Sequence, residues 1–147
     1  MKWVSFLFAN YATFSGRVSR SLYWRMQLRL SLIPFIIFIS LFNVVGSGSS
    51  VWMATLMIGW LLAILILLPS VALTVRRLHD GGHSGMWLVF TFSASMFGRI
   101  VNWERFENFG SLIMFIQSMA ALYILIMICE QGDSGPNEYG DVPVDTM

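Results

Sequence analysis

One apolar run constrains the fold of this chain more than any other feature. Residues 51–75 form a stretch of 25 residues without a charged side chain. A helix rises about 1.5 Å per residue, so this run is longer than the roughly 30 Å hydrocarbon core of a bilayer. The run therefore predicts a membrane-spanning helix that tilts or bends, with Pro69 supplying a bend near its far end.

The overall composition agrees with a membrane protein. Of the 147 residues, 56% are hydrophobic and 12% are charged, whereas soluble domains are about 25% charged. A soluble chain of this length would need more polar surface to cover one core. The net charge of +1 provides no field that would attract nucleic acid. We therefore expect one membrane domain, 1–147, with the lipid bilayer as partner and no nucleic acid.

Three further apolar runs predict additional spans, at about 28–45, 86–101 and 111–128. The short Gly/Ser turn at 46–50 makes the first two spans antiparallel. The run at 86–101 is short enough to be a re-entrant piece, but we favour a full span. The expected fold class is all-α, an integral membrane bundle of about four transmembrane helices.

Both ends of the chain differ from the spans. Residues 1–16 are rich in aromatic side chains but too short to cross, which predicts a segment lying in the membrane interface that is helical up to a break at Phe14-Ser15-Gly16. The alternative is a loose terminus packed on the bundle. Residues 130–147 carry five acidic residues and no basic one, so we expect an acidic tail. Its turn-rich part, 135–140, is expected to fold back onto the basic loop near residue 80.

The lysines and arginines predict the orientation of the spans. With four spans, one side receives seven of the nine basic residues and the other receives only Arg99 and Arg105. Because basic residues accumulate on the cytoplasmic side, both termini are expected to be cytoplasmic.

A polar loop at 76–85 separates two of the apolar runs. Its arginines suit a helix C-terminus, and Gly81-Gly82 is expected to stop that helix. Asp80 can accept hydrogen bonds from arginines of the loop or from those at 17 and 20. We expect one polar cluster on the cytoplasmic face, which either holds the fold together or binds anionic lipid headgroups. Its members are Arg17, Arg20, Arg76, Arg77, Asp80, Asn137 and Tyr139.

Small and polar residues inside the spans predict packing faces. Thr55, Gly59 and Ala63 recur every four residues and form a helix-packing seam. Polar residues in the first and last spans predict interior faces, because a polar group in lipid usually points at protein. These residues are Ser40, Asn43, Gln117 and Ser118.

No catalytic or metal motif is evident. His79, Asp80 and His83 have a spacing that metal ligands use on helices, but Gly81-Gly82 interrupts the helix and no third histidine or cysteine is nearby. Ser84 follows His83 directly, and neighbouring residues rarely face each other as nucleophile and base. We expect no metal site, no cofactor and no enzymatic activity.

Three motifs together resemble one family. They are Phe14-Ser15-Gly16-Arg17-Val18-Ser19-Arg20-Ser21-Leu22-Tyr23-Trp24, then Arg76 to Trp87, then Gly135-Pro136-Asn137-Glu138-Tyr139-Gly140. The chain is similar over most of its length to the bacterial membrane family called "domain of unknown function 805". The resemblance implies a multi-pass protein of the bacterial inner membrane and no particular activity. The family's pattern carries over to Gly16, Arg17, Arg20, Tyr23, Trp24, Arg76, Arg77, Leu78, Asp80, Ser84, Gly85, Asn137, Tyr139 and Gly140.

Two positions depart from that pattern. Leu22 stands where the family usually has an acid, and Glu138 stands where a basic residue is common. A salt bridge typical of relatives is therefore either absent or rebuilt in this chain.

Two functional hypotheses rank ahead of a third, a lipid-modifying or metal-dependent enzyme. The first is an accessory subunit of a larger membrane assembly or a self-associating homo-oligomer. The spans carry small-residue packing faces but no row of polar side chains typical of a pore or a catalytic site. The alternative is a carrier or channel for a small solute, ion or lipid, which the polar residues within the spans favour.

Overall fold

The computed structural model describes residues 11–45, 50–100 and 107–144. They form four helices: α2 (Arg20–Val45), α3 (Ser50–Asp80), α4 (Met86–Ile100) and α5 (Glu107–Cys129). The described part of the chain contains no strand beyond an isolated bridge between Asn137 and Gly140. The predicted all-α fold class is therefore confirmed.

Helix α2 begins at Arg20, well before the predicted start near residue 28. The Ser19 hydroxyl accepts a hydrogen bond from the Leu22 amide at 3.3 Å, which satisfies a donor that the first turn leaves without a partner. Leu22 and Met26 share one face of the first turns, and both are buried. An N-cap and a buried face therefore allow the helix to start before the apolar run at 28–45.

Helix α3 continues through the arginines and ends at Asp80 rather than at residue 75. The His83 amide donates to the Leu78 carbonyl at 2.9 Å, and Gly82 has a φ of 72°. Glycine adopts this left-handed conformation without strain, so the chain can turn away from the helix here. The predicted stop at Gly81-Gly82 is confirmed.

The predicted seam on α3 packs within the chain at its centre. A Cβ atom added to Gly59 would lie 2.4 Å from Cε2 of Phe38 on α2. Thr55 is buried, and its hydroxyl donates to the Val51 carbonyl at 3.0 Å. Ala63 is exposed. Gly59 therefore leaves room for the Phe38 ring and allows α2 and α3 to form a close hairpin.

Helices α4 and α5 form the second hairpin, in which the Trp87 and Tyr123 rings meet edge to face with centroids 5.4 Å apart. Among the described residues, three helical segments are long and apolar enough to cross a membrane: Arg20–Ser40, Val51–Asp80 and Leu112–Cys129. Helix α4 has 15 residues and is not among them. Residues 101–106 lie outside the described residues, so a fourth full span stays a prediction.

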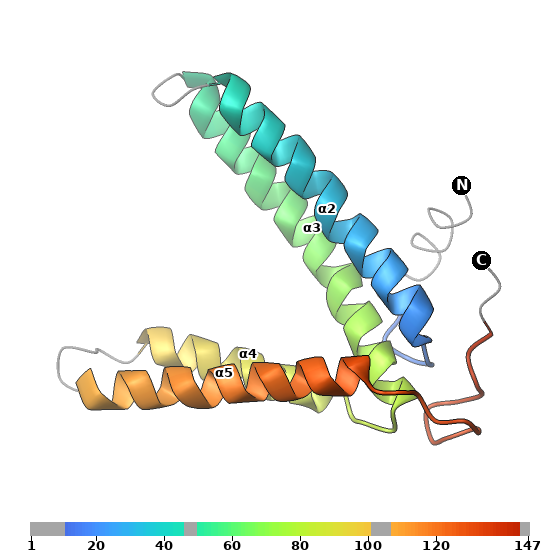
Figure 1. Ribbon diagram of the computed structural model, residues 1–147. Coiled ribbons are helices and arrows are strands. Elements are labelled where there is room, and N and C mark those ends of the chain that lie inside the picture. The colour runs from blue at the N-terminus through green and yellow to red at the C-terminus, as the bar shows by residue number, and fades with distance from the viewer. Residues whose placement is uncertain (1–10, 46–49, 101–106, 145–147) are drawn as a thin grey trace.

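The two hairpins meet at one end and diverge from there (Figure 1). The buried core lies where they meet, at the C-terminal ends of α3 and α5 and the start of α2. Its members are Val18, Leu22, Tyr23, Met26, Leu73, Leu78, Ile124, Met127 and Ile128. Farther along the helices, large apolar side chains such as Trp60 and Met114 are about 70% exposed (72% and 68%). Such an exposed apolar surface suits lipid.

The structure describes only the end of the predicted interfacial segment, including the predicted break at Phe14-Ser15-Gly16. Tyr11 to Gly16 forms turns and bends rather than a helix. Residues 1–10 lie outside the described residues. Gly16 has a φ of 86°, a conformation that opposes a helix leading directly into α2.

Candidate functional site

Asp80, the last residue of α3, is the centre of a buried ionic cluster. Its side chain lies between two arginines, and the residue is 3% exposed. Oδ1 accepts from Arg17 Nε at 3.0 Å, and Oδ2 accepts from Nη1 of Arg77. Both arginines are themselves buried. One carboxylate is therefore shared by two guanidinium groups, and the positive charge that it does not balance needs further acceptors.

Backbone carbonyls of the acidic tail supply acceptors to Arg17. Its Nη1 donates to the Gly135 carbonyl at 2.7 Å and to that of Gly140 at 3.3 Å. Its Nη2 donates to the Asp133 carbonyl at 2.7 Å. The rigid planar fork of arginine reaches these separate acceptors at once. Arg17 therefore joins the segment before α2 to the tail after α5.

The C-terminal end of α5 is capped by two other arginines. Arg77 Nε donates to the Ile128 carbonyl at 2.9 Å, and Nη2 donates to that of Glu130. Arg20 Nη1 donates to the Cys129 carbonyl at 3.1 Å. The last carbonyls of a helix lack helical partners and carry partial negative charge, so cations are favourable there. These contacts tie the second hairpin to α2 and α3.

The turn at 137–140 covers the outer side of the cluster. Asn137 Nδ2 donates to the His79 carbonyl at 2.9 Å, and Asn137 Oδ1 accepts from the Tyr139 amide at 3.0 Å. The Tyr139 ring stacks on the His79 ring with centroids 3.9 Å apart and an interplanar angle of 7°. A hydrogen bond to Glu138 raises the pKa of the Tyr139 phenol, so this hydroxyl stays neutral. The tail thus folds back onto the loop, as the sequence predicts.

Gly132 fits a position where no side chain has room. A Cβ atom at this residue would lie 2.0 Å from Oδ2 of Asp80. The next amide, that of Asp133, donates to the Asp80 carbonyl at 2.8 Å. The tail backbone therefore lies directly against the carboxylate. Sequence reasoning missed this residue, because a glycine in a Gly/Ser-rich tail resembles any other turn residue.

All predicted cluster residues lie in this region, but they differ in their contacts. Arg17, Arg77 and Asp80 form the buried centre, whereas Arg20 is exposed and Arg76 is half-buried. The N–H groups of Arg17 are all directed at acceptors of the chain itself. A phosphate would have to displace these acceptors, so the geometry favours a structural role for Arg17 and Arg77 over headgroup binding.

The two histidines have separate partners. His79 Nδ1 lies 3.2 Å from the Gly16 carbonyl oxygen, whereas His83 Nε2 lies 3.8 Å from Oε2 of Glu130. Ser84 acts as a cap, because its hydroxyl accepts from the Met86 amide at 3.3 Å at the start of α4. Within the described ranges, no three His, Cys, Asp or Glu side chains are grouped as metal ligands.

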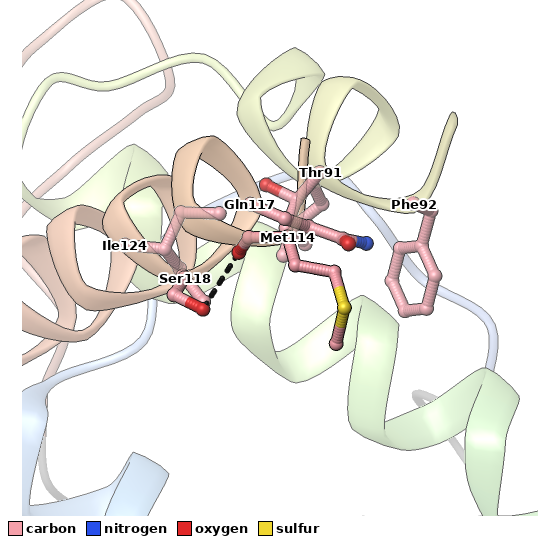
Figure 2. Close-up of a pocket in the computed structure, with 8 residues that line it drawn as sticks. Thr91, Phe92, Met114, Gln117, Ser118 and Ile124 are labelled. Atoms are coloured by element: carbon pink, nitrogen blue, oxygen red, sulfur yellow. Dashed lines mark hydrogen bonds between the residues drawn. The ribbon is translucent and has the colours of Figure 1, made fainter. Parts of the chain in front are cut away.

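Each hairpin has a hollow along its length. The one on α2 and α3 measures about 730 Å³ and is lined mainly by apolar side chains. The one on α4 and α5 measures about 480 Å³, and its lining includes Thr91, Gln117 and Ser118 (Figure 2). Two of the predicted interior residues, Ser40 and Ser118, are exposed and bond to carbonyls of their own helices. The side chain of Asn43 is outside the described part.

Three long apolar helices and a buried charge cluster at one end define a helical integral membrane protein. A family described as "Protein of unknown function (DUF805)" matches residues 11–141. The chain therefore belongs to this family, as the three motifs predict.

Two relatives have names that state a location. The chain is 31% identical over 143 residues to "Inner membrane protein YhaI" of Escherichia coli K12, covering 97% of this chain and 96% of the relative. It is 26% identical over 146 residues to "Inner membrane protein YhaH" of the same strain, covering 97% of each chain. No solved structure matches. The orientation with both termini in the cytoplasm stays a prediction.

Proposed function

We propose that this protein is a non-enzymatic interaction protein of the membrane, either an accessory subunit of a larger assembly or a self-associating bundle. One observation carries the proposal: the two hairpins join at one end and leave their remaining lengths apart (Figure 1). A protein that folds only to bury its own helices would pack the hairpins together along their length.

The polar cluster supports this proposal because it holds the joint without providing a reactive site. Both buried arginines and Asp80 are engaged with each other and with backbone carbonyls. The same contacts fix the second hairpin to the first at the core. The cluster thus acts as a rigid joint that presents two helix pairs to the bilayer.

The lateral surfaces of the two hairpins support the proposal because they are exposed to the bilayer, where another protein can contact them. Helix association in lipid depends on close packing and on hydrogen bonds between helices, since lipid tails are as apolar as the side chains. Both hairpins carry hollows that are lined mainly by apolar side chains. At the membrane surface, the exposed Arg25 and Arg29 of α2 are the side chains that we expect to meet anionic headgroups.

Native mass determination in mild detergent tests this function. We expect a homo-oligomer or a defined complex with another membrane protein, because the diverging hairpins carry hollows at which another helix can pack closely. A pure monomer from native membranes, with no companion after gentle extraction, contradicts the proposal. Solute flux in liposomes that contain only the monomer would instead favour the carrier or channel.

A further inference from the structure

Gln117 is a polar residue at the middle of a membrane-spanning helix. It lies 12 positions before Cys129, the last residue of the 23-residue helix α5. At about 1.5 Å per residue the two residues are roughly 18 Å apart along the helix, close to half the thickness of the hydrocarbon core. Since α5 ends at the polar cluster, Gln117 is placed near the middle of the bilayer.

The amide of Gln117 lacks a hydrogen-bonding partner in the described part of the chain, although its neighbours have theirs. Ser118 donates to the Met114 carbonyl at 2.8 Å, and Thr91 donates to that of Trp87 at 2.9 Å. Figure 2 shows the Gln117 amide extended away from the Ser118 hydroxyl, which turns back to its own helix. An amide in hydrocarbon without a partner is costly, so this group requires a partner from elsewhere.

The surface around this amide is shaped for another helix. Gln117 lines the hollow of about 480 Å³ together with the small residues Ser118 and Ala121, which are exposed. Met114, one turn earlier, is 68% exposed. Small side chains allow a neighbouring backbone to approach closely, and a flexible methionine adapts to the surface that covers it.

We propose that α5 of a second copy of this chain occupies the hollow, so that the two Gln117 amides hydrogen-bond to each other. The inference rests on the proposed interaction function and names the partner and the contact. A side-chain amide carries both a donor and an acceptor. Two such amides related by a two-fold axis therefore satisfy each other with two hydrogen bonds in an isologous interface.

A second copy suits this surface better than a charged ligand. The residues that line the hollow are Leu88, Thr91, Phe92, Met114, Gln117, Ser118, Ala121 and Ile124, and none carries a charge. An ion would lose its hydration without gaining a counter-charge. An apolar helix would cover the hollow but leave the amide without a partner. An identical helix supplies both the apolar contact and the missing hydrogen bonds.

Disulfide cross-linking in native membranes tests the contact. Ala121→Cys is introduced into a Cys129→Ser background, which removes the only native cysteine. We expect a covalent dimer after mild oxidation, because two Ala121 residues would face each other across the axis. The matched control is Met119→Cys, also exposed on α5 but on the other side of the helix from Gln117. Equal cross-linking of both variants, or of neither, overturns the proposed interface.

The role of the amide is tested by energy transfer between labelled copies at increasing lipid dilution. Gln117→Met keeps the length of the side chain but removes both polar groups, and we expect roughly tenfold or greater weakening of dimerisation. Gln117→Asn keeps an amide and should retain part of the association. An unchanged Gln117→Met dimer overturns the proposed contact while the interaction function stands. A wild-type chain that is monomeric at every lipid ratio contradicts both.

Discussion

Replacing Asp80 with alanine should remove most of the folded protein from the membrane. The change leaves two buried guanidinium groups, those of Arg17 and Arg77, without their shared counter-charge. Breaking a buried ion pair by removing one partner costs about 3–5 kcal/mol, which is a large part of a typical stability of about 5–15 kcal/mol. The amount of protein in the membrane fraction and the midpoint of thermal unfolding in detergent measure the effect.

Asp141→Ala is the matched control, because Asp141 is an exposed acid in the same tail. Removing it changes the net charge by the same amount without touching the cluster, so its unfolding midpoint should stay at the wild-type value. A wild-type midpoint for Asp80→Ala as well would show that the cluster does not hold the two hairpins together.

Adding a single methyl group at position 132 should have an effect of similar size. The Cβ atom in Gly132→Ala would lie 2.0 Å from Oδ2 of Asp80, far inside van der Waals contact. The carboxylate is held by Arg17 and Arg77, so the tail backbone must move instead. We expect a loss of at least about 1–3 kcal/mol from overpacking, with more if the hydrogen bond between Asp133 and Asp80 breaks. The midpoint of thermal unfolding in detergent measures the loss.

Gly135→Ala provides the control for this change. Gly135 lies in the same tail, and a Cβ atom there would meet no heavy atom within 4 Å. Gly135 does not have a positive φ, unlike Gly16, Gly82 and Gly140, so alanine fits its backbone conformation. This variant should therefore unfold at the wild-type temperature. If the two alanine variants unfold at the same temperature, the tail does not lie against Asp80 as described.

The helical architecture could be predicted from the sequence because charge-free runs leave few alternatives in a bilayer. The boundaries of the helices could not be predicted in the same way. Helix α2 starts at Arg20 because Ser19 caps it, and α3 extends to Asp80 because its last residues pack in the core. Hydropathy marks the lipid-soluble part of a helix, whereas caps and buried contacts set where it ends. The divergence of the hairpins has no sequence signal, because lipid-facing and partner-facing apolar residues are alike.

The cluster was predictable in its charged members but not in its geometry. Asp80 lies within the polar loop at 76–85, beside Arg76 and Arg77, so its pairing with an arginine could be expected. The carbonyl acceptors of Arg17 and Arg77 could not, because a backbone carbonyl is present at every residue. The role of Gly132 is also invisible, since only the position of the Asp80 carboxylate excludes a side chain there.

Side-specific thiol labelling tests the central claim most directly, namely that the segment before α2, the loop after α3 and the tail meet at one end of the helices. Ser15→Cys, Ser84→Cys and Ser134→Cys each replace an exposed serine, one in each segment, and are made in the Cys129→Ser background. A membrane-impermeant maleimide should label all three from the same, cytoplasmic side of oriented vesicles. Labelling of Ser15→Cys and Ser84→Cys from opposite sides would contradict the account.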